Sequence, residues 1–138
     1  MSARDEAKEI VEEFAFFDDW EDRYQHLIDM GRRLPDLDPS YMTEENRLRG
    51  CQSVVHFAAE YADPELKFYA GSDAAIVQGL IAVMMRVYSG RTPDDILATS
   101  PSFLEEIGLD EHLSPTRKNG LAAMVTAIMT EAQKSAES

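Results

Sequence analysis

The chain has 138 residues, of which 44% are hydrophobic, and its formal net charge at pH 7 is −13. This length and apolar content predict one ordered domain over residues 1–138 with a buried core, rather than a disordered chain. This acidic excess argues against binding to nucleic acid or to an anionic membrane surface, because both attract clustered Lys and Arg. It serves either solubility or the docking of a partner with a basic face.

Two amphipathic helices are predicted at the start of the chain. The first is expected to run from an N-cap at Ser2 to about Phe17. Asp18 and Asp19 interrupt the apolar pattern and can cap a second helix, whose apolar residues recur at helical spacing: Trp20, Tyr24, Leu27, Ile28 and Gly31. The prolines that follow do not allow a helix to continue, so residues 34–45 are expected to form a loop.

A small antiparallel sheet is predicted next. Asn46–Arg49 can form a short strand, and Val54–Tyr61, which begins with β-branched and aromatic residues, can form a second one. Asp63-Pro64 is a turn signal, and the run Glu65–Ala70 after it places alternate apolar residues on one side: Leu66, Phe68 and Ala70. Two or three consecutive strands favour an antiparallel meander.

Helices are predicted for the rest of the chain. Gly71 and Ser72 are expected to open the most apolar helix, from Asp73 to about Tyr88, with Ser72 as its N-cap and Gly90 past its end. Three hydroxyl–proline pairs each predict a further helix start: Thr92-Pro93, Ser100-Pro101 and Ser114-Pro115. The last of these helices is long, and its predicted core face comprises Leu121, Met124, Val125, Ile128 and Met129. The order of elements predicts an α+β domain, in which an antiparallel sheet of about three strands is flanked by helices.

The only cysteine of the chain lies in the stretch Arg49-Gly50-Cys51-Gln52-Ser53. A buried cysteine that acts as a small hydrophobe is one interpretation. A reactive thiol is the other, because Gly50 permits a tight or left-handed turn and the charge of Arg49 can favour the thiolate. Gln52 and Ser53 supply further hydrogen-bond donors close by. Spacing alone leaves both interpretations open.

Metal binding and hydrolytic chemistry have weaker support in the sequence. His26, His56 and His112 are scattered, and a single cysteine cannot build a metal-ligand pair or hold an iron–sulfur cluster. We therefore expect no metal site. A hydrolase or peroxidase that uses Cys51 with His56 is conceivable, but no third orienting group and no oxyanion site can be identified.

The cysteine count and the N-terminus predict a cytoplasmic protein. One cysteine cannot form an internal disulfide, so nothing indicates an oxidising compartment. Residues 1–6 are acidic and lack the apolar core of a signal peptide. The longest nearly uncharged apolar run, Ala74–Met85, is too short to span a bilayer.

Four blocks of the sequence resemble the SufE family, the sulfur-acceptor partners of cysteine desulfurases. They occur in the order of that family, and the likeness covers roughly residues 10–132: LIDMGRRLP (27–35), RGCQSVV (49–55), GSDAAIVQGL (71–80) and HLSPTRKNGL (112–121). The resemblance implies a small antiparallel sheet flanked by helices, similar to the cluster scaffolds of the IscU type.

The same resemblance implies a role for Cys51. Its thiolate would attack the terminal sulfur of a persulfide on a SufS- or CsdA-like cysteine desulfurase, stimulate that enzyme, and pass the sulfur to an iron–sulfur scaffold or another acceptor. The chain would need no cofactor of its own, because pyridoxal phosphate belongs to the desulfurase. It would be a carrier rather than a free-standing enzyme.

Further residue roles follow from the resemblance. Arg117 would help to hold the thiolate or dock the partner, and Asp73 would support the cysteine loop, which would be shaped by Gly50, Gln52 and Ser53. His56 stands where the family commonly has tryptophan, so packing beneath the loop is expected to differ. The cysteine of the family is tucked in an apolar pocket, which would raise the pKa of the Cys51 thiol until a partner draws the loop out.

Two other functions remain open at this point. A regulatory module would raise desulfurase turnover by contact without carrying sulfur. A free-standing thiol enzyme would turn over a small electrophile without any partner.

Overall fold

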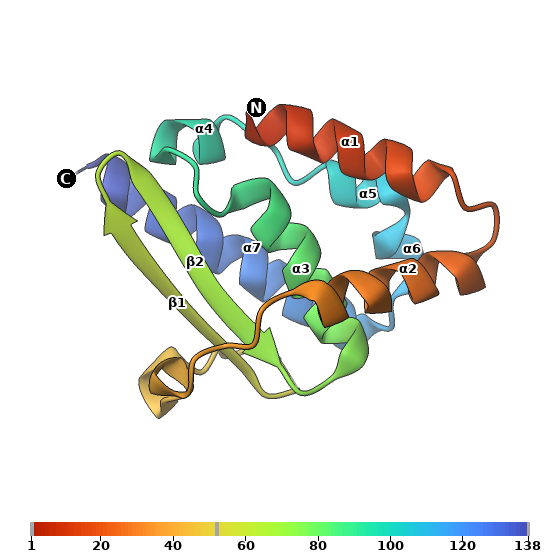
Figure 1. Ribbon diagram of the computed structural model, residues 1–138, viewed down its shortest axis with the longest axis horizontal. Coiled ribbons are helices and arrows are strands. Elements are labelled where there is room, and N and C mark those ends of the chain that lie inside the picture. The colour runs from red at the N-terminus through yellow and green to blue at the C-terminus, as the bar shows by residue number, and fades with distance from the viewer. Residues whose placement is uncertain (1, 52, 138) are drawn as a thin grey trace.

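Helices make up most of the molecule, and one β-hairpin lies along their side (Figure 1). The computed structural model describes residues 2–51 and 53–137. The elements are α1 (Ala3–Ala15), α2 (Trp20–Arg33), the short 3₁₀ helices η1 (Pro39–Tyr41) and η2 (Glu44–Asn46), β1 (Val55–Ala62), β2 (Glu65–Ser72), α3 (Ala75–Tyr88), α4 (Pro93–Leu97), α5 (Phe103–Ile107), α6 (Leu109–His112) and α7 (Pro115–Ala136). The α+β class is therefore as predicted.

The first two helices form where the sequence predicts them because each N-terminus carries its own cap. At α1 the Ser2 hydroxyl accepts a hydrogen bond from the Asp5 N–H at 3.1 Å, and the Asp5 carboxylate accepts one from the Ser2 N–H. At α2 the Asp19 carboxylate accepts from the Asp22 N–H at 2.8 Å. Helix α1 ends at Ala15, two residues before the predicted end.

The sheet has two strands within the described residues, not about three. β1 and β2 pair antiparallel from Val55 opposite Ser72 to Ala62 opposite Glu65. The predicted strand over Asn46–Arg49 is wrong, since only an isolated bridge from Arg47 to His56 forms there. The N–H groups of Asn46 and Arg47 bond back to carbonyls in the 3₁₀ turn η2, at 3.1 and 3.2 Å, so this turn competes with strand pairing.

Helix α3 is the central helix of the fold, between α2, α7 and the hairpin (Figure 1). It is buried nearly all round, as its apolar sequence predicts. The predicted start and cap are wrong: Ser72 still belongs to β2, and α3 begins at Ala75 after Ala74. The Ser72 hydroxyl accepts a hydrogen bond from the Ala74 N–H at 3.3 Å, before the helix starts.

Helices α2 and α3 touch backbone to backbone through two glycines. A Cβ at Gly79 would lie 2.4 Å from the carbonyl oxygen of Leu27, and a Cβ at Gly31 would lie 2.7 Å from the Gly79 nitrogen. Both distances are shorter than any normal contact. Glycine is therefore required on each side of this crossing.

The remaining helices include two confirmed caps and one wrong one. The Thr92 hydroxyl caps α4 and the Ser114 hydroxyl caps α7, where it accepts from the Arg117 N–H at 3.3 Å. Ser100 does not cap α5, because its hydroxyl accepts from the Ser102 N–H and the helix begins only at Phe103. On α7 the predicted core residues Leu121, Met124 and Ile128 are buried, while Val125 and Met129 are partly buried against the core.

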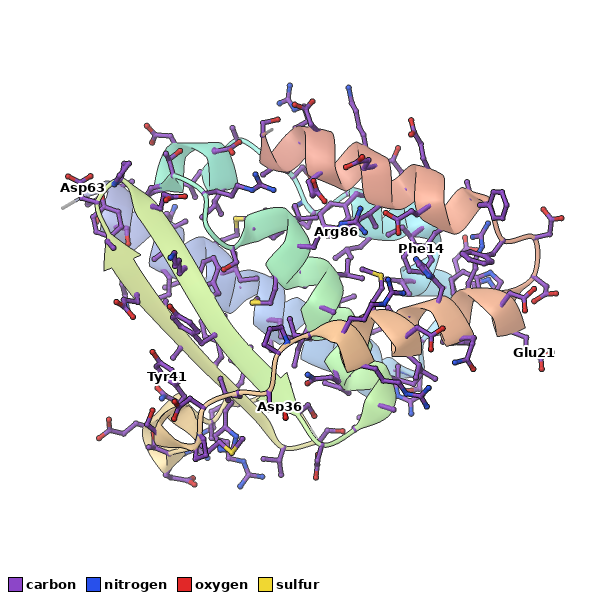
Figure 2. The ribbon with its side chains drawn as sticks, viewed as in Figure 1. Phe14, Glu21, Asp36, Tyr41, Asp63 and Arg86 are labelled. Atoms are coloured by element: carbon purple, nitrogen blue, oxygen red, sulfur yellow. The ribbon has the colours of Figure 1, made fainter. Side chains whose placement is uncertain are left out.

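An ion cluster ties α1 to α3. Arg86 extends from α3 toward α1 (Figure 2), where its guanidinium contacts Glu6 at 2.6 Å and also pairs with Glu13. Hydrogen bonding to Arg86 holds the pKa of the Glu13 carboxyl below its usual range. Across the described part of the chain, no helix has both the length and the apolar character that crossing a membrane requires.

Candidate functional site

Cys51 lies on the loop that joins the Arg47–Leu48 segment to β1, and its side chain turns toward α7. Gly50, directly before it, has φ +91°, a conformation that favours glycine and turns the chain toward the helix. The thiol donates to the Gly120 carbonyl at 3.8 Å, a long contact even for sulfur. A Cβ at Gly120 would lie 3.4 Å from the sulfur. A methyl group at Gly120 would therefore touch the thiol at an ordinary van der Waals distance.

A small cavity of about 20 Å³ adjoins the thiol. Helix α3 contributes two of its lining residues and α7 contributes five; the lining comprises Cys51, Ser53, Val77, Leu80, Thr116, Arg117, Gly120, Leu121 and Met124. This volume holds about one atom of the size of a water oxygen. Most of the exposed lining is apolar, so the cavity favours sulfur or carbon over a charged group.

Burial raises the pKa of the Cys51 thiol above its ordinary value. The expected lowering by Arg49 is wrong for this conformation, because the Arg49 guanidinium is 83% exposed and lies 3.7 Å from the carboxylate of Glu44. The upward shift of the thiol pKa agrees instead with a cysteine in an apolar pocket, as the family resemblance implies. In this position the thiol is neutral at pH 7 and a weak nucleophile.

The other residues singled out in the sequence fall into two groups. Ser53 and Arg117 line the cavity together with Cys51, and Arg117 is exposed on the first turn of α7. Asp73 is exposed and is not part of the lining, and His56 lies in β1 opposite Gly71, also outside it. Gln52 lies outside the described residues.

A Cys51–His56 catalytic pair is not formed in this structure. Among the described residues, the thiol's hydrogen-bond partner is the Gly120 carbonyl and not an imidazole nitrogen. Nor does the described part of the chain bring together three or more His, Cys, Asp or Glu side chains that could hold a metal ion.

Sequence reasoning missed most of the cavity wall. Val77, Leu80 and Thr116 were not recognised as neighbours of the cysteine, because they are brought to it only by the packing of α3 and α7. Gly120 carried a signal that could have been used. Glycine inside a helix costs about 1 kcal/mol relative to alanine, so its presence there indicates a close approach by another group.

The thiol is expected to react slowly and with a shifted pH profile. Raised pKa means that the folded protein keeps the proton to higher pH than a free thiol does, so the thiolate fraction at pH 8 is smaller. Iodoacetamide alkylation of Cys51, followed by intact mass, should be slower for the native chain than for the chain in 8 M urea, and its inflection should lie at higher pH. Equal rates and equal inflections in both states would contradict the partly buried position of the thiol.

Comparisons with known proteins agree on one family. A family model described as SufE, Fe-S metabolism associated domain, matches residues 8–132. An uncharacterized SufE-like protein of Rhizobium meliloti (strain 1021) is 40% identical over 130 residues, which are 91% of this chain and 93% of that protein. Another of Rhizobium etli is 41% identical over 130 residues, covering 91% of this chain and 88% of the relative.

The fold also has a counterpart among solved structures. The solution structure of a hypothetical protein from Thermus thermophilus matches with a TM-score of 0.80 and covers 96% of this chain and 97% of that one. The two sequences are 24% identical, so this likeness concerns the fold alone.

Proposed function

The chain belongs to the SufE family, whose domain is associated with Fe-S metabolism, and from that premise we propose that it is a cytoplasmic sulfur acceptor. It takes sulfur from a pyridoxal-phosphate-dependent cysteine desulfurase onto Cys51 and passes it on to iron–sulfur cluster assembly. It thereby also stimulates the desulfurase, because it empties the enzyme's persulfide for the next turnover.

The transfer is a thiol–persulfide exchange. The Cys51 thiolate attacks the terminal sulfur of the desulfurase persulfide, a new S–S bond forms, and the old S–S bond breaks. The desulfurase cysteine leaves as a thiolate, so electrons balance without any added oxidant or reductant. The chain has no second cysteine that could convert the new persulfide into an internal disulfide, so the sulfur stays transferable.

The position of Cys51 is the main support for this function. Its thiol adjoins an apolar cavity with room for about one more atom, which suits a terminal sulfur. Enclosure there would shield the persulfide from soluble thiols until an acceptor arrives. The same enclosure keeps the empty thiol protonated, so reactivity depends on a partner that draws the loop outward about Gly50.

Arg117 is the charged residue of the cavity lining and has its guanidinium exposed at the N-terminal turn of α7. We infer that it stabilises the Cys51 thiolate or persulfide as the loop moves outward. We assign the docking role to the same exposed position. The roles of Asp73, Ser53 and Gly50 in supporting the loop belong to this proposal as well.

The test is intact-protein mass spectrometry after incubation with a cysteine desulfurase and cysteine. We expect one or more added sulfur atoms that dithiothreitol removes, and because the chain has one cysteine these belong to Cys51. Prior alkylation of Cys51 in urea, followed by refolding, provides the matched negative control. A protein that speeds the desulfurase but never gains sulfur would be a regulatory module, and the carrier function would be wrong.

A further inference from the structure

The two outer edges of the hairpin differ in how they are covered. A strand at a sheet edge exposes backbone N–H and C=O groups that can pair with another chain. On β2, three of the four residues whose backbone groups face outward are covered by the chain itself. At N–O distances of 2.8 to 2.9 Å, the Leu66 N–H donates to the Arg91 carbonyl, the Phe68 N–H to the Ser89 hydroxyl, and the Ser72 N–H to the Gln78 side chain.

Within the described residues, the edge of β1 is covered at its beginning and open further along. There the Leu48 N–H donates to the Val55 carbonyl at 2.8 Å. Further along, Ala59 lies opposite Phe68 and Tyr61 opposite Leu66. Because the Phe68 and Leu66 N–H groups face away from the hairpin, the alternation of antiparallel pairing makes the groups of Ala59 and Tyr61 face outward too. Among the described residues, no backbone or side-chain group hydrogen-bonds them on that side.

A hollow of about 430 Å³ lies beside this open part of β1. It is bounded by β1, η2, the Arg47–Leu48 segment and α7, with a lining of Glu45, Asn46, Arg47, Leu48, Phe57, Ala58, Ala59, Ala127, Thr130 and Glu131. Alanine at three of these positions leaves space for an incoming backbone. Proteins commonly prevent strand addition with a proline, a β-bulge or a lysine on the edge strand. None of these three occurs between Phe57 and Tyr61.

We propose that this edge binds an extended, basic segment of a partner protein, which adds to β1 as a third strand. Its backbone would hydrogen-bond Ala59 and Tyr61 and continue the pairing that Leu48 begins. Glu45 and Glu131 line the hollow together with Arg47, Glu131 also pairs with Lys134 at 3.7 Å, and Glu60 on β1 lies opposite Lys67 on β2. The preference for a basic partner therefore comes from the net charge of −13 on the whole chain. A second copy of this chain fits poorly, because each copy carries a net charge of −13.

This surface is separate from the cysteine cavity. The proposed strand binding therefore does not depend on whether Cys51 carries sulfur. The Arg47–Leu48 segment that borders the hollow nevertheless leads within two residues to Gly50. A partner held on β1 would therefore contact the segment that carries the cysteine loop.

The test is amide hydrogen exchange of the ¹⁵N-labelled full chain with a synthetic probe peptide, acetyl-Lys-Val-Lys-Val-Lys-Val-Lys-amide. We expect saturating peptide to slow exchange of the Ala59 and Tyr61 amides by at least about tenfold. The same peptide with alternate amides N-methylated, and an analogue with Glu in place of Lys, should not do so. Absence of protection at millimolar peptide, or equal protection by the Glu analogue, would overturn the proposal.

Two variants separate strand addition from other contacts. Ala127→Phe fills the hollow without altering β1 and should abolish protection, whereas Ala122→Phe, on an exposed site of α7 outside the hollow, should not. Ala59→Pro removes one outward N–H, leaves the β1–β2 ladder bonds in place, and should weaken peptide binding. Protection that appears without peptide and grows with protein concentration would show that the edge pairs with a second copy instead.

Discussion

Replacing Cys51 by serine is expected to abolish sulfur uptake and, with it, the stimulation of desulfurase turnover. A hydroxyl is smaller than a thiol and fits the same position beside the cavity, so the fold should be retained. Its oxygen is not ionised at neutral pH and does not attack a persulfide, so the loss is chemical. Alanine production by the desulfurase under saturating cysteine should fall to the rate measured without the chain.

Thr116→Ser is the matched control, because Thr116 lines the same cavity but carries no sulfur chemistry. It should keep most of the stimulation. Circular dichroism melting of both variants checks that each is folded. Stimulation that persists undiminished in Cys51→Ser would identify a regulatory module, which binds the desulfurase but carries nothing.

Gly79→Ala is expected to destabilise the protein by about 3 kcal/mol. The new methyl group would lie 2.4 Å from the Leu27 carbonyl oxygen and 2.9 Å from the carbonyl carbon, which are backbone atoms that cannot rotate away. Helices α2 and α3 would have to separate, and the core between them would lose packing. The helix propensity of alanine offsets only about 1 kcal/mol of this cost.

Gly120→Ala is the matched control for that substitution. It also lies inside a long helix, yet its methyl group would meet the Cys51 side chain at ordinary contact distances, 3.4 Å from the sulfur and 3.9 Å from Cβ. Its stability should be unchanged or raised by up to about 1 kcal/mol. Urea denaturation of the two variants measures both effects, and equal losses in stability would show that the α2–α3 crossing can relax.

The elements that the sequence predicts well are those determined by neighbouring residues. A helix N-cap needs only a side-chain oxygen that accepts a hydrogen bond from the N–H three residues later. This is why the predicted caps form at Ser2, Asp19, Thr92 and Ser114. Ser72 has the same local chemistry, but pairing with Val55 across the hairpin keeps it in β2. Such pairing depends on contacts that no local pattern contains.

At the candidate site, too, local features could be predicted and features that depend on distant residues could not. The turn at Gly50 and the single thiol could be predicted from adjacent residues. The direction of the pKa shift of Cys51 could not be predicted from them, because Arg49 points into solvent and the burial comes from two distant helices. The family resemblance predicted that the cysteine lies in a pocket. The structure shows which residues line it, among them Val77 of α3 and Gly120 of α7.

The covered edge of β2 limits how copies of this molecule can associate through strands. A protein with two open edges offers a fresh edge after every addition, so pairing can continue into a fibre. Here Ser89, Gln78 and the Arg91 carbonyl occupy most of the β2 side in the described structure. Among the described residues β1 is the edge with room for a strand, so two copies that met edge to edge would form a closed pair and polymerisation would stop there.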